Sequence, residues 1–305
     1  MLRFVARRIV ETIPVLFIIA TLTFFMMRLA PGGPFDKEKA STPEIRKAIE
    51  AYYGLDRPFL EQYLKVLKGY LQGDLGPDYK YPNRTVNELI GDSFPVSLEL
   101  GLLSLLIALV LGITAGLIAA VRRNSVFDYS AMSLAMIGIC LPTFVMGPIL
   151  ALLFAIHLHW FNASGWDFAR DRVLPAMTLG CYFAAFIARL TRGGMLEMLS
   201  QDFVRTAKAK GASTARILFK HALRGGIAPV VSFLGPAAAG LITGSFVVET
   251  IFDIPGLGRF FITSAFNRDY TLVLGTVLFY AVLIIFFNLL VDILQLWLNP
   301  KLKFD

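Results

Sequence analysis

The side chains that could take part in chemistry are few, and they do not gather into a reactive group. His157 and His159 are close in the sequence, but no third metal ligand is near them. Cys140 and Cys181 fall inside apolar segments without a CxxC spacing, so we interpret them as small buried residues and not as disulfide or metal ligands. The sequence has no GxxxxGK[ST], HExxH or GxSxG motif. It therefore predicts no catalytic residue, no metal site and no cofactor bound by the chain itself.

The densest group of charged side chains belongs to a segment that we call the basic loop, residues 200–226 (SQDFVRTAKAKGASTARILFKHALRGG). Its basic residues, together with one that precedes it, are Arg192, Arg205, Lys208, Lys210, Arg216, Lys220 and Arg224. Apolar segments long enough to cross a bilayer lie on both sides of the loop. One reading is that these charges only hold the loop on the cytoplasmic side of a membrane. An anchor, however, does not need the two ordered helices that the sequence of the loop predicts.

The first helix predicted in the basic loop runs from Asp202 to Lys210. Phe203 and Ala207 are four residues apart, which places them on one face of this helix. Arg205 and Lys208 fall on the opposite face. The helix therefore presents one face with an aromatic ring and a small residue, and a second face with positive charge.

A glycine turn and a second helix are predicted to follow. Gly211 comes directly after the first helix, where a glycine usually forms a left-handed cap. Ser213 is placed to cap the second helix, Thr214 to Arg224, because its hydroxyl can accept a bond from a free N–H group of the first turn. Gly225 and Gly226 are predicted to stop this helix.

The composition of the whole chain is that of a membrane protein. Of its 305 residues 56% are hydrophobic and the mean hydropathy is +0.65, whereas soluble domains are about 45–50% apolar. The net charge of +7 could suggest a nucleic-acid partner. These charges sit in short segments between apolar runs and not along one groove, so the sequence indicates membrane topology and no nucleic acid.

Six apolar segments are predicted to span the membrane as helices, which makes the chain an all-α polytopic protein. The predicted spans are Ile9–Ala30, Pro95–Val121, Tyr129–His157, Val173–Leu190, Ile227–Val248 and Thr271–Leu298. The first span is expected to be retained, because no small-residue cleavage site follows it. The predicted organisation is residues 1–34 with the N-terminus and first span, an insertion at 35–94, and a five-helix core at 95–305 that contains the basic loop.

The insertion is polar and is predicted to form a small ordered domain outside the membrane. Pro43 to Ala51 and Leu60 to Leu71 have the pattern of short amphipathic helices. In the second helix the leucines recur on one face, which we expect to be buried because apolar surface is costly to leave in water. These leucines are Leu60, Leu64, Leu67 and Leu71.

The positive charges predict that both termini and the basic loop face the cytoplasm. The predicted cytoplasmic segments hold most of the short-loop lysines and arginines. The two short outer loops, 157–172 and 249–270, hold only Arg170, Arg172, Arg259 and Arg268. A long charged segment such as 35–94 is largely exempt from this rule, so its charges do not argue against an outer location.

Motifs spread over the chain are similar to those of one family of transporters. The basic loop resembles in part the EAA loop of permeases from ATP-binding-cassette importers, with Arg205-Thr206-Ala207 at the position of EAA and Gly211 at its glycine. Residues 246–252 (FVVETIF) and 255–258 (PGLG) resemble the ETIF–PGLG motif of B-type permeases closely. Further matches are LAPG at 29–32, LDRP at 55–58, GDLG at 73–76 and HAL at 221–223. The chain resembles the permeases for oligopeptides, dipeptides and nickel, and the oligopeptide branch most closely.

The resemblance implies a type I importer permease fold in the bacterial inner membrane, with a periplasmic helical insertion. The partners that it implies are a second permease subunit in a heterodimer, two cytoplasmic ATPase subunits that bind ATP and magnesium, a periplasmic substrate-binding protein, and membrane lipid. The residues implied to couple to the ATPases are Phe203, Arg205, Thr206, Ala207, Lys208, Gly211, His221 and Leu223. Those implied to face the binding protein are Glu249, Pro255, Gly256 and Gly258. The sequence leaves the cargo open between oligopeptide, dipeptide, glutathione and nickel chelate.

Two other classes of function were weighed. An ion-coupled secondary transporter tends to need ionisable groups deep in the bilayer. Here Glu11, Arg28, Glu99, Glu249 and Asp292 all fall near the ends of predicted spans. A membrane-embedded enzyme would need a catalytic polar cluster, and no such motif is present. Transport assays of the purified chain, alone and with candidate ATPases, separate these classes because only the importer needs a second polypeptide.

Overall fold

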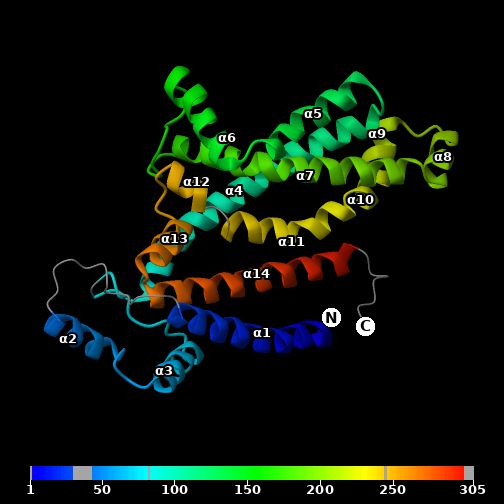
Figure 1. Ribbon diagram of the computed structural model, residues 1–305. Helices are drawn as coiled ribbons and strands as arrows, with labels where there is room; N and C mark the ends of the chain where they lie inside the picture. Colours follow the sequence, from blue (N-terminus) through cyan, green and yellow to red (C-terminus); the bar gives the residue numbers. More distant parts are fainter. Residues whose placement is uncertain (1, 30–42, 82, 244–245, 299–305) are drawn as a thin grey trace. The chain divides into compact units, whose positions relative to one another are not determined.

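The structure is a computed structural model that describes residues 2–29, 43–81, 83–243 and 246–298 (Figure 1). Within these ranges the chain is helical and contains no strand, only an isolated antiparallel bridge between Pro77 and Thr85. The elements are α1 (Leu2–Leu29), α2 (Pro43–Tyr53), α3 (Phe59–Leu71), α4 (Val86–Val121), α5 (Val126–Cys140), α6 (Thr143–Leu150), η1 (Ala151–His157), η2 (Ala169–Arg172), α7 (Val173–Leu199), α8 (Asp202–Ala209), α9 (Thr214–Arg216), η3 (Ile217–Ala222), α10 (Leu223–Gly226), α11 (Ala228–Thr243), α12 (Phe246–Ile251), α13 (Leu257–Asn267) and α14 (Tyr270–Leu298). The predicted all-α fold is confirmed, and α2 and α3 are the two helices predicted in the insertion.

Five helices in the described ranges are long and apolar enough to cross a membrane, and a bent pair makes a sixth if it is counted as one span. This pair corresponds to the predicted third span and consists of Val126–Cys140 and Thr143–His157, which meet at 108°. The break falls at Leu141, whose ψ of 115° is extended, because a proline disfavours the helical conformation in the residue before it. The segment predicted as the third span therefore consists of two helices with a sharp break between them.

The helices form two compact units. The first consists of Met1–Val96 and Gly256–Ile285, and the second of Ser97–Pro255 and Phe286–Asp305. The segment predicted as an insertion, 35–94, falls in the same unit as α1 and the first part of α14. The predicted border at residue 95 lies within the continuous helix α4.

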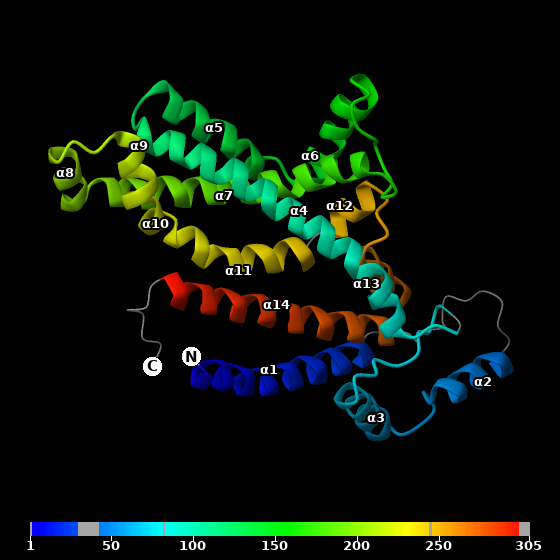
Figure 2. The ribbon, with the colours of Figure 1, turned by 180° about the vertical axis from the view of Figure 1, so that it is seen from behind.

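The second unit is built around α7. Of the most apolar part of this span 56% is buried, the largest share among the five candidate spans. A Cβ added to Gly112 would lie 2.7 Å from the carbonyl oxygen of Ala184, and one added to Gly116 would lie 2.6 Å from that of Ala188. The residue numbers at these two contacts increase in the same direction along both helices, so α4 and α7 run parallel and their backbones are in close contact. The two helices lie side by side in both views (Figures 1 and 2).

The helix α5 lies antiparallel along α7. Near one end of the contact, a Cβ added to Gly138 would lie 2.2 Å from the carbonyl oxygen of Cys181, a distance that no real Cβ atom tolerates. Near the other end, Asp128 is bonded to Arg192. The absence of a side chain at Gly138 is therefore required for the two backbones to approach each other.

Small residues of α11 also serve packing. Ala237, Ala238 and Ala239 are buried, and a Cβ added to Gly240 would lie 3.2 Å from the ring of Phe183 on α7.

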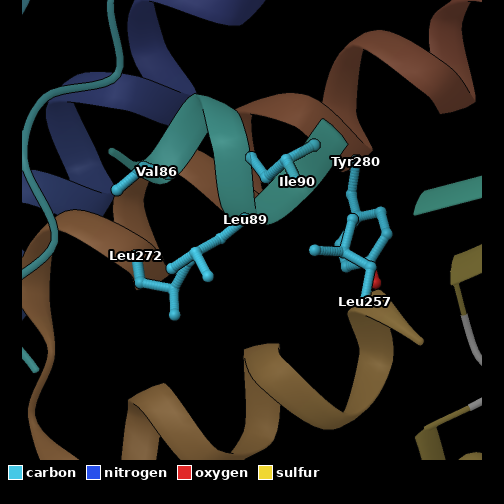
Figure 3. Packing of buried hydrophobic residues seen from close by; sticks show 6 residues of the cluster. All are labelled: Val86, Leu89, Ile90, Leu257, Leu272 and Tyr280. Carbon is cyan, nitrogen blue, oxygen red and sulfur yellow. The ribbon is translucent and has the colours of Figure 1, made fainter. Parts of the chain in front are cut away.

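The first unit has a separate apolar core. Side chains from the start of α4, from α13 and from α14 meet in it, and Figure 3 shows the Tyr280 ring beside Leu257. The buried members are Val86, Leu89, Ile90, Leu257, Leu272 and Tyr280. Since α13 supplies Leu257, the segment 249–270, predicted as an outer loop, is helical for much of its length.

The helix α3 is held against α1 by aromatic side chains and not by its leucines. The rings of Phe59 and Tyr63 lie 5.3 and 5.4 Å from that of Phe24. Leu60, Leu64 and Leu71 are exposed on α3, and none of its residues is fully buried. The prediction that the leucine face packs against the protein is wrong. Cys140, expected to be buried, is likewise exposed.

The carboxyl groups of Asp78 and Asp269 are both buried in the first unit. Asp78 and Asp269 are each about 1% exposed, and one carboxyl oxygen of each is buried without a hydrogen-bond donor. The other oxygen of Asp78 accepts bonds from two backbone N–H groups, and that of Asp269 accepts from the Thr271 hydroxyl. Burial, and next the charge of Asp78, raise the pKa of Asp269 to about 7.

The contact of α5 with α7 makes a first prediction. Gly138→Ala places a methyl group against a backbone carbonyl and should cost about 1–3 kcal/mol through overpacking. Gly193→Ala is the matched control, because a Cβ at this helical glycine meets nothing within 4 Å. Thermal unfolding of the purified protein in detergent should show a lower midpoint for the first variant only. Equal midpoints would contradict the close approach.

The carboxyl pair makes a second prediction, on pH. The unfolded Asp269 releases its proton near its ordinary pKa of 3.8, whereas the folded one keeps it up to about pH 7. The folded state binds more protons in this window, so stability should fall as the pH rises through it and level off above. Asp269→Asn should flatten the dependence of the thermal midpoint on pH. Asp56→Asn, at an exposed carboxylate, should leave it unchanged.

Candidate functional site

The basic loop has the predicted arrangement of helix, glycine turn and helix. The first helix is α8. Gly211 follows shortly after its end, and the Gly211 N–H group donates to the carbonyl oxygen of Lys208 at 2.9 Å. Gly211 has a φ of +77°, so the predicted left-handed cap is confirmed. The Ser213 side chain accepts a bond from the N–H group of Arg216, which caps the second helix as predicted.

The second helix of the basic loop anchors it to the helical core. It consists of α9, the π-helical η3 and α10, which together continue through the two glycines that were predicted to stop it. A Cβ added to Gly194 of α7 would lie 2.2 Å from the carbonyl oxygen of Gly226, so the two backbones touch. Ala222 is buried with Met195 and Ala120, while Leu223 packs against this cluster. The glycines thus permit docking and do not end the helix.

The first helix of the loop, in contrast, leaves most of its surface exposed. Only Val204 of α8 is buried. Phe203 is 39% exposed and Ala207 is half-buried, so the aromatic face predicted for this helix is open. Arg205, Thr206, Lys208 and His221 are exposed. Arg205 forms an ion pair of 3.4 Å with Asp202, whose exposed position makes it weak.

An ion pair next to the loop was missed in the sequence. The Arg192 guanidinium donates from its Nε and Nη2 atoms to the two carboxylate oxygens of Asp128, at 2.8 Å each. The Asp128 side chain is 3% exposed and also accepts from the N–H group of Asn124. The sequence does contain a signal for a structural role of Asp128, because Ser125 and Asp128 have the spacing of a capping box at the start of α5. The predicted span begins at Tyr129 and does not include Asp128.

The PGLG segment and its flanking residues are mostly covered. Glu249 is fully buried and its Oε1 accepts a bond of 2.7 Å from the hydroxyl of the equally buried Ser97. Gly256 and Gly258 are also buried, and Pro255 is exposed. The expectation that the Glu249 side chain faces a binding protein does not fit this geometry, since its carboxylate is turned into the second unit and bonded there.

Comparison with protein families shows to which family the chain belongs. The family described as binding-protein-dependent transport system inner membrane component matches residues 112–304, and its N-terminal companion matches residues 1–101. The chain belongs to this family of inner-membrane transport components, and the family expected from the motifs is thereby confirmed.

Relatives of known name are similar over the full length. The oligopeptide transport system permease protein OppB of Haemophilus influenzae is 47% identical, with 100% of both chains covered. The dipeptide transport system permease protein DppB of Bacillus subtilis is 44% identical, over 99% of this chain and 98% of the relative. Both relatives are named as permease proteins of peptide transport systems.

Solved structures show the same fold at low identity. The inward-facing methionine ABC transporter MetNI aligns with a TM-score of 0.57 at 17% identity, over 69% of this chain and 96% of that one. An amino acid ABC transporter aligns with a TM-score of 0.53 at 16% identity, over 71% and 95%. The importer permease fold predicted from the motifs is confirmed.

The missed ion pair makes a third prediction. Asp128→Asn removes the charge that faces Arg192 and should destabilise the second unit by about 1–3 kcal/mol, because a partly buried guanidinium loses its bidentate partner. Thermal unfolding and protease cleavage within the basic loop should both become easier. Asp202→Asn, which removes the exposed pair with Arg205, is the matched control and should change neither. Indistinguishable variants would contradict a bracing role for Asp128.

Proposed function

We propose that the chain is the permease subunit of an ATP-driven importer for oligopeptides and forms half of the translocation pathway. The observation that carries this proposal is the full-length identity of 47% to an oligopeptide permease. A dipeptide permease is only slightly less similar, so the cargo class is peptide and its length is the finer part of the proposal. The chain itself then needs no nucleotide site, and ATP and magnesium belong to partner subunits.

The basic loop is proposed to couple this permease to one of two cytoplasmic ATPase subunits. Its second helix is docked on α7 and α4, whereas α8 presents Phe203 and Ala207 outward. An open aromatic face on a helix that is joined to a docked one suits insertion into a groove of a partner. Arg205 and Lys208 are exposed on α8, where they can meet an acidic rim or lipid headgroups.

A second permease of the same family and a periplasmic substrate-binding protein complete the proposed assembly. In the segment 249–258 only a part of the surface is available to the binding protein. Pro255 is exposed, and we assign it to that contact. The buried Glu249 and the buried Gly256 and Gly258 are assigned to holding the segment in shape.

The test is reconstitution. The chain, its second permease and two ATPases are placed in proteoliposomes with the binding protein and a labelled pentapeptide. Uptake should require all components and ATP. Uptake by the chain alone under a proton or sodium gradient would replace the proposal with an ion-coupled transporter. Uptake of a dipeptide but not of the pentapeptide would keep the importer and correct its cargo.

Gly211 makes a fourth prediction. Gly211→Val puts a β-branched side chain at a φ of +77°, which costs about 1–2 kcal/mol in backbone strain. No atom lies within 4 Å of the added Cβ, so the effect is one of conformation and not of space. The variant should reach the membrane at normal levels and lose most of its peptide-stimulated ATP hydrolysis.

The matched control at this position is Gly211→Asn, because asparagine tolerates the left-handed conformation. It should keep most of the stimulated hydrolysis. Full activity of the valine variant would contradict the role of the cap in coupling. Loss of the valine variant from the membrane would show that Gly211 serves folding.

A further inference from the structure

The helix α3 carries an uncovered apolar stripe. Leu60, Leu64 and Leu71 are 64%, 55% and 90% exposed, and Leu67 completes the same face at helical spacing. The neighbouring face carries charged side chains, of which Lys65 and Lys68 are exposed. An amphipathic helix of this kind, with a leucine face and a lysine-bearing face, is typical of helices that lie in a membrane interface.

The depth of α3 follows from its contacts with the membrane span α1. The Tyr63 hydroxyl is bonded to the Thr21 hydroxyl at 2.8 Å, and the Tyr63 ring lies 5.4 Å from that of Phe24. The apolar part of α1 ends at Leu29, five residues after Phe24, which is about 7 Å along the helix axis. The contact therefore lies at the boundary between headgroups and hydrocarbon, where interfacial helices insert to about 5–10 Å.

The direction of the stripe follows from the order of these contacts around α3. Gln62 is bonded to Arg28, near the end of α1, whereas Tyr63 contacts α1 about two turns deeper, at Thr21. Leu60 and Leu67 are three residues before and four residues after Tyr63, so the stripe continues the face of α3 beyond Tyr63, on the side away from Gln62. It is thus directed toward the membrane centre.

The stripe also continues an exposed apolar surface of the membrane span α1. On α1, Leu22, Met26 and Leu29 are 57%, 70% and 81% exposed, next to the positions that hold α3. We propose that α3 is an interfacial helix whose leucine stripe lies in the hydrocarbon of the outer leaflet, with Lys65 at the headgroups. This inference concerns the insertion and holds whichever cargo the permease carries.

The test places a fluorescent label on each side of α3. The protein is purified with its partner subunits and reconstituted into lipid nanodiscs, after replacement of Cys140 and Cys181 by serine. Leu64→Cys is labelled with an environment-sensitive dye, and Lys65→Cys is the matched control on the neighbouring residue. Quenching is measured with doxyl-labelled phospholipids and with aqueous iodide.

The label at Leu64 should lose most of its fluorescence to the lipid quencher and little to iodide, and the label at Lys65 should show the reverse. Quenching of the Leu64 label by iodide would overturn the inference, because the stripe would then face water. Protection from both quenchers would also overturn it, since another polypeptide would then cover the stripe. Leu60→Cys, on the same stripe, repeats the measurement if the Leu64 variant fails to assemble.

Discussion

Direct contact between helix backbones is the constraint on which the second unit depends. At Gly112 and Gly138 the carbonyl oxygens of α7 lie where a side chain would otherwise stand, and α4 and α5 are fixed in distance and register as a result. In a bilayer, lipid is as apolar as leucine, so the hydrophobic effect does little to bring helices together. Close van der Waals packing must do so instead. The position of every element attached to α7 follows from it, including the basic loop.

The same packing explains why the basic loop combines a fixed half and an open half. Its second helix is docked by the touching backbones of Gly194 and Gly226, while Asp128 and Arg192 hold the neighbouring start of α5. Of the first helix, α8, only Val204 is buried. A helix that is already formed and oriented loses little ordering entropy if it binds a partner.

The sequence predicted the features that local chemistry decides. The cap at Gly211 and the amphipathic helices follow from single residues and their spacing, and the spans follow from long apolar runs. It failed where long-range packing decides. Leucine spacing alone predicts an apolar face but not whether protein or lipid covers it, so Leu64 was placed inside. Glu249 was placed in an outer loop because nothing near it in the sequence reveals its bond to Ser97. Proline can either kink a helix or break it, so Pro142 alone does not predict the 108° bend that the structure has before it.

One consequence of the ion pairs concerns mechanics. Arg172, just before the first turn of α7, is paired with Glu99 of α4 at 2.6 Å, and Arg192, in its last third, is paired with Asp128 of α5. The two arginines are 20 residues apart, which is about 30 Å along α7, and α7 makes backbone contacts between them. Such a rod has little room to bend or slide against its neighbours. A displacement of the basic loop would then also move the opposite end of α7, and α4 and α5 would move with α7 as one rigid body.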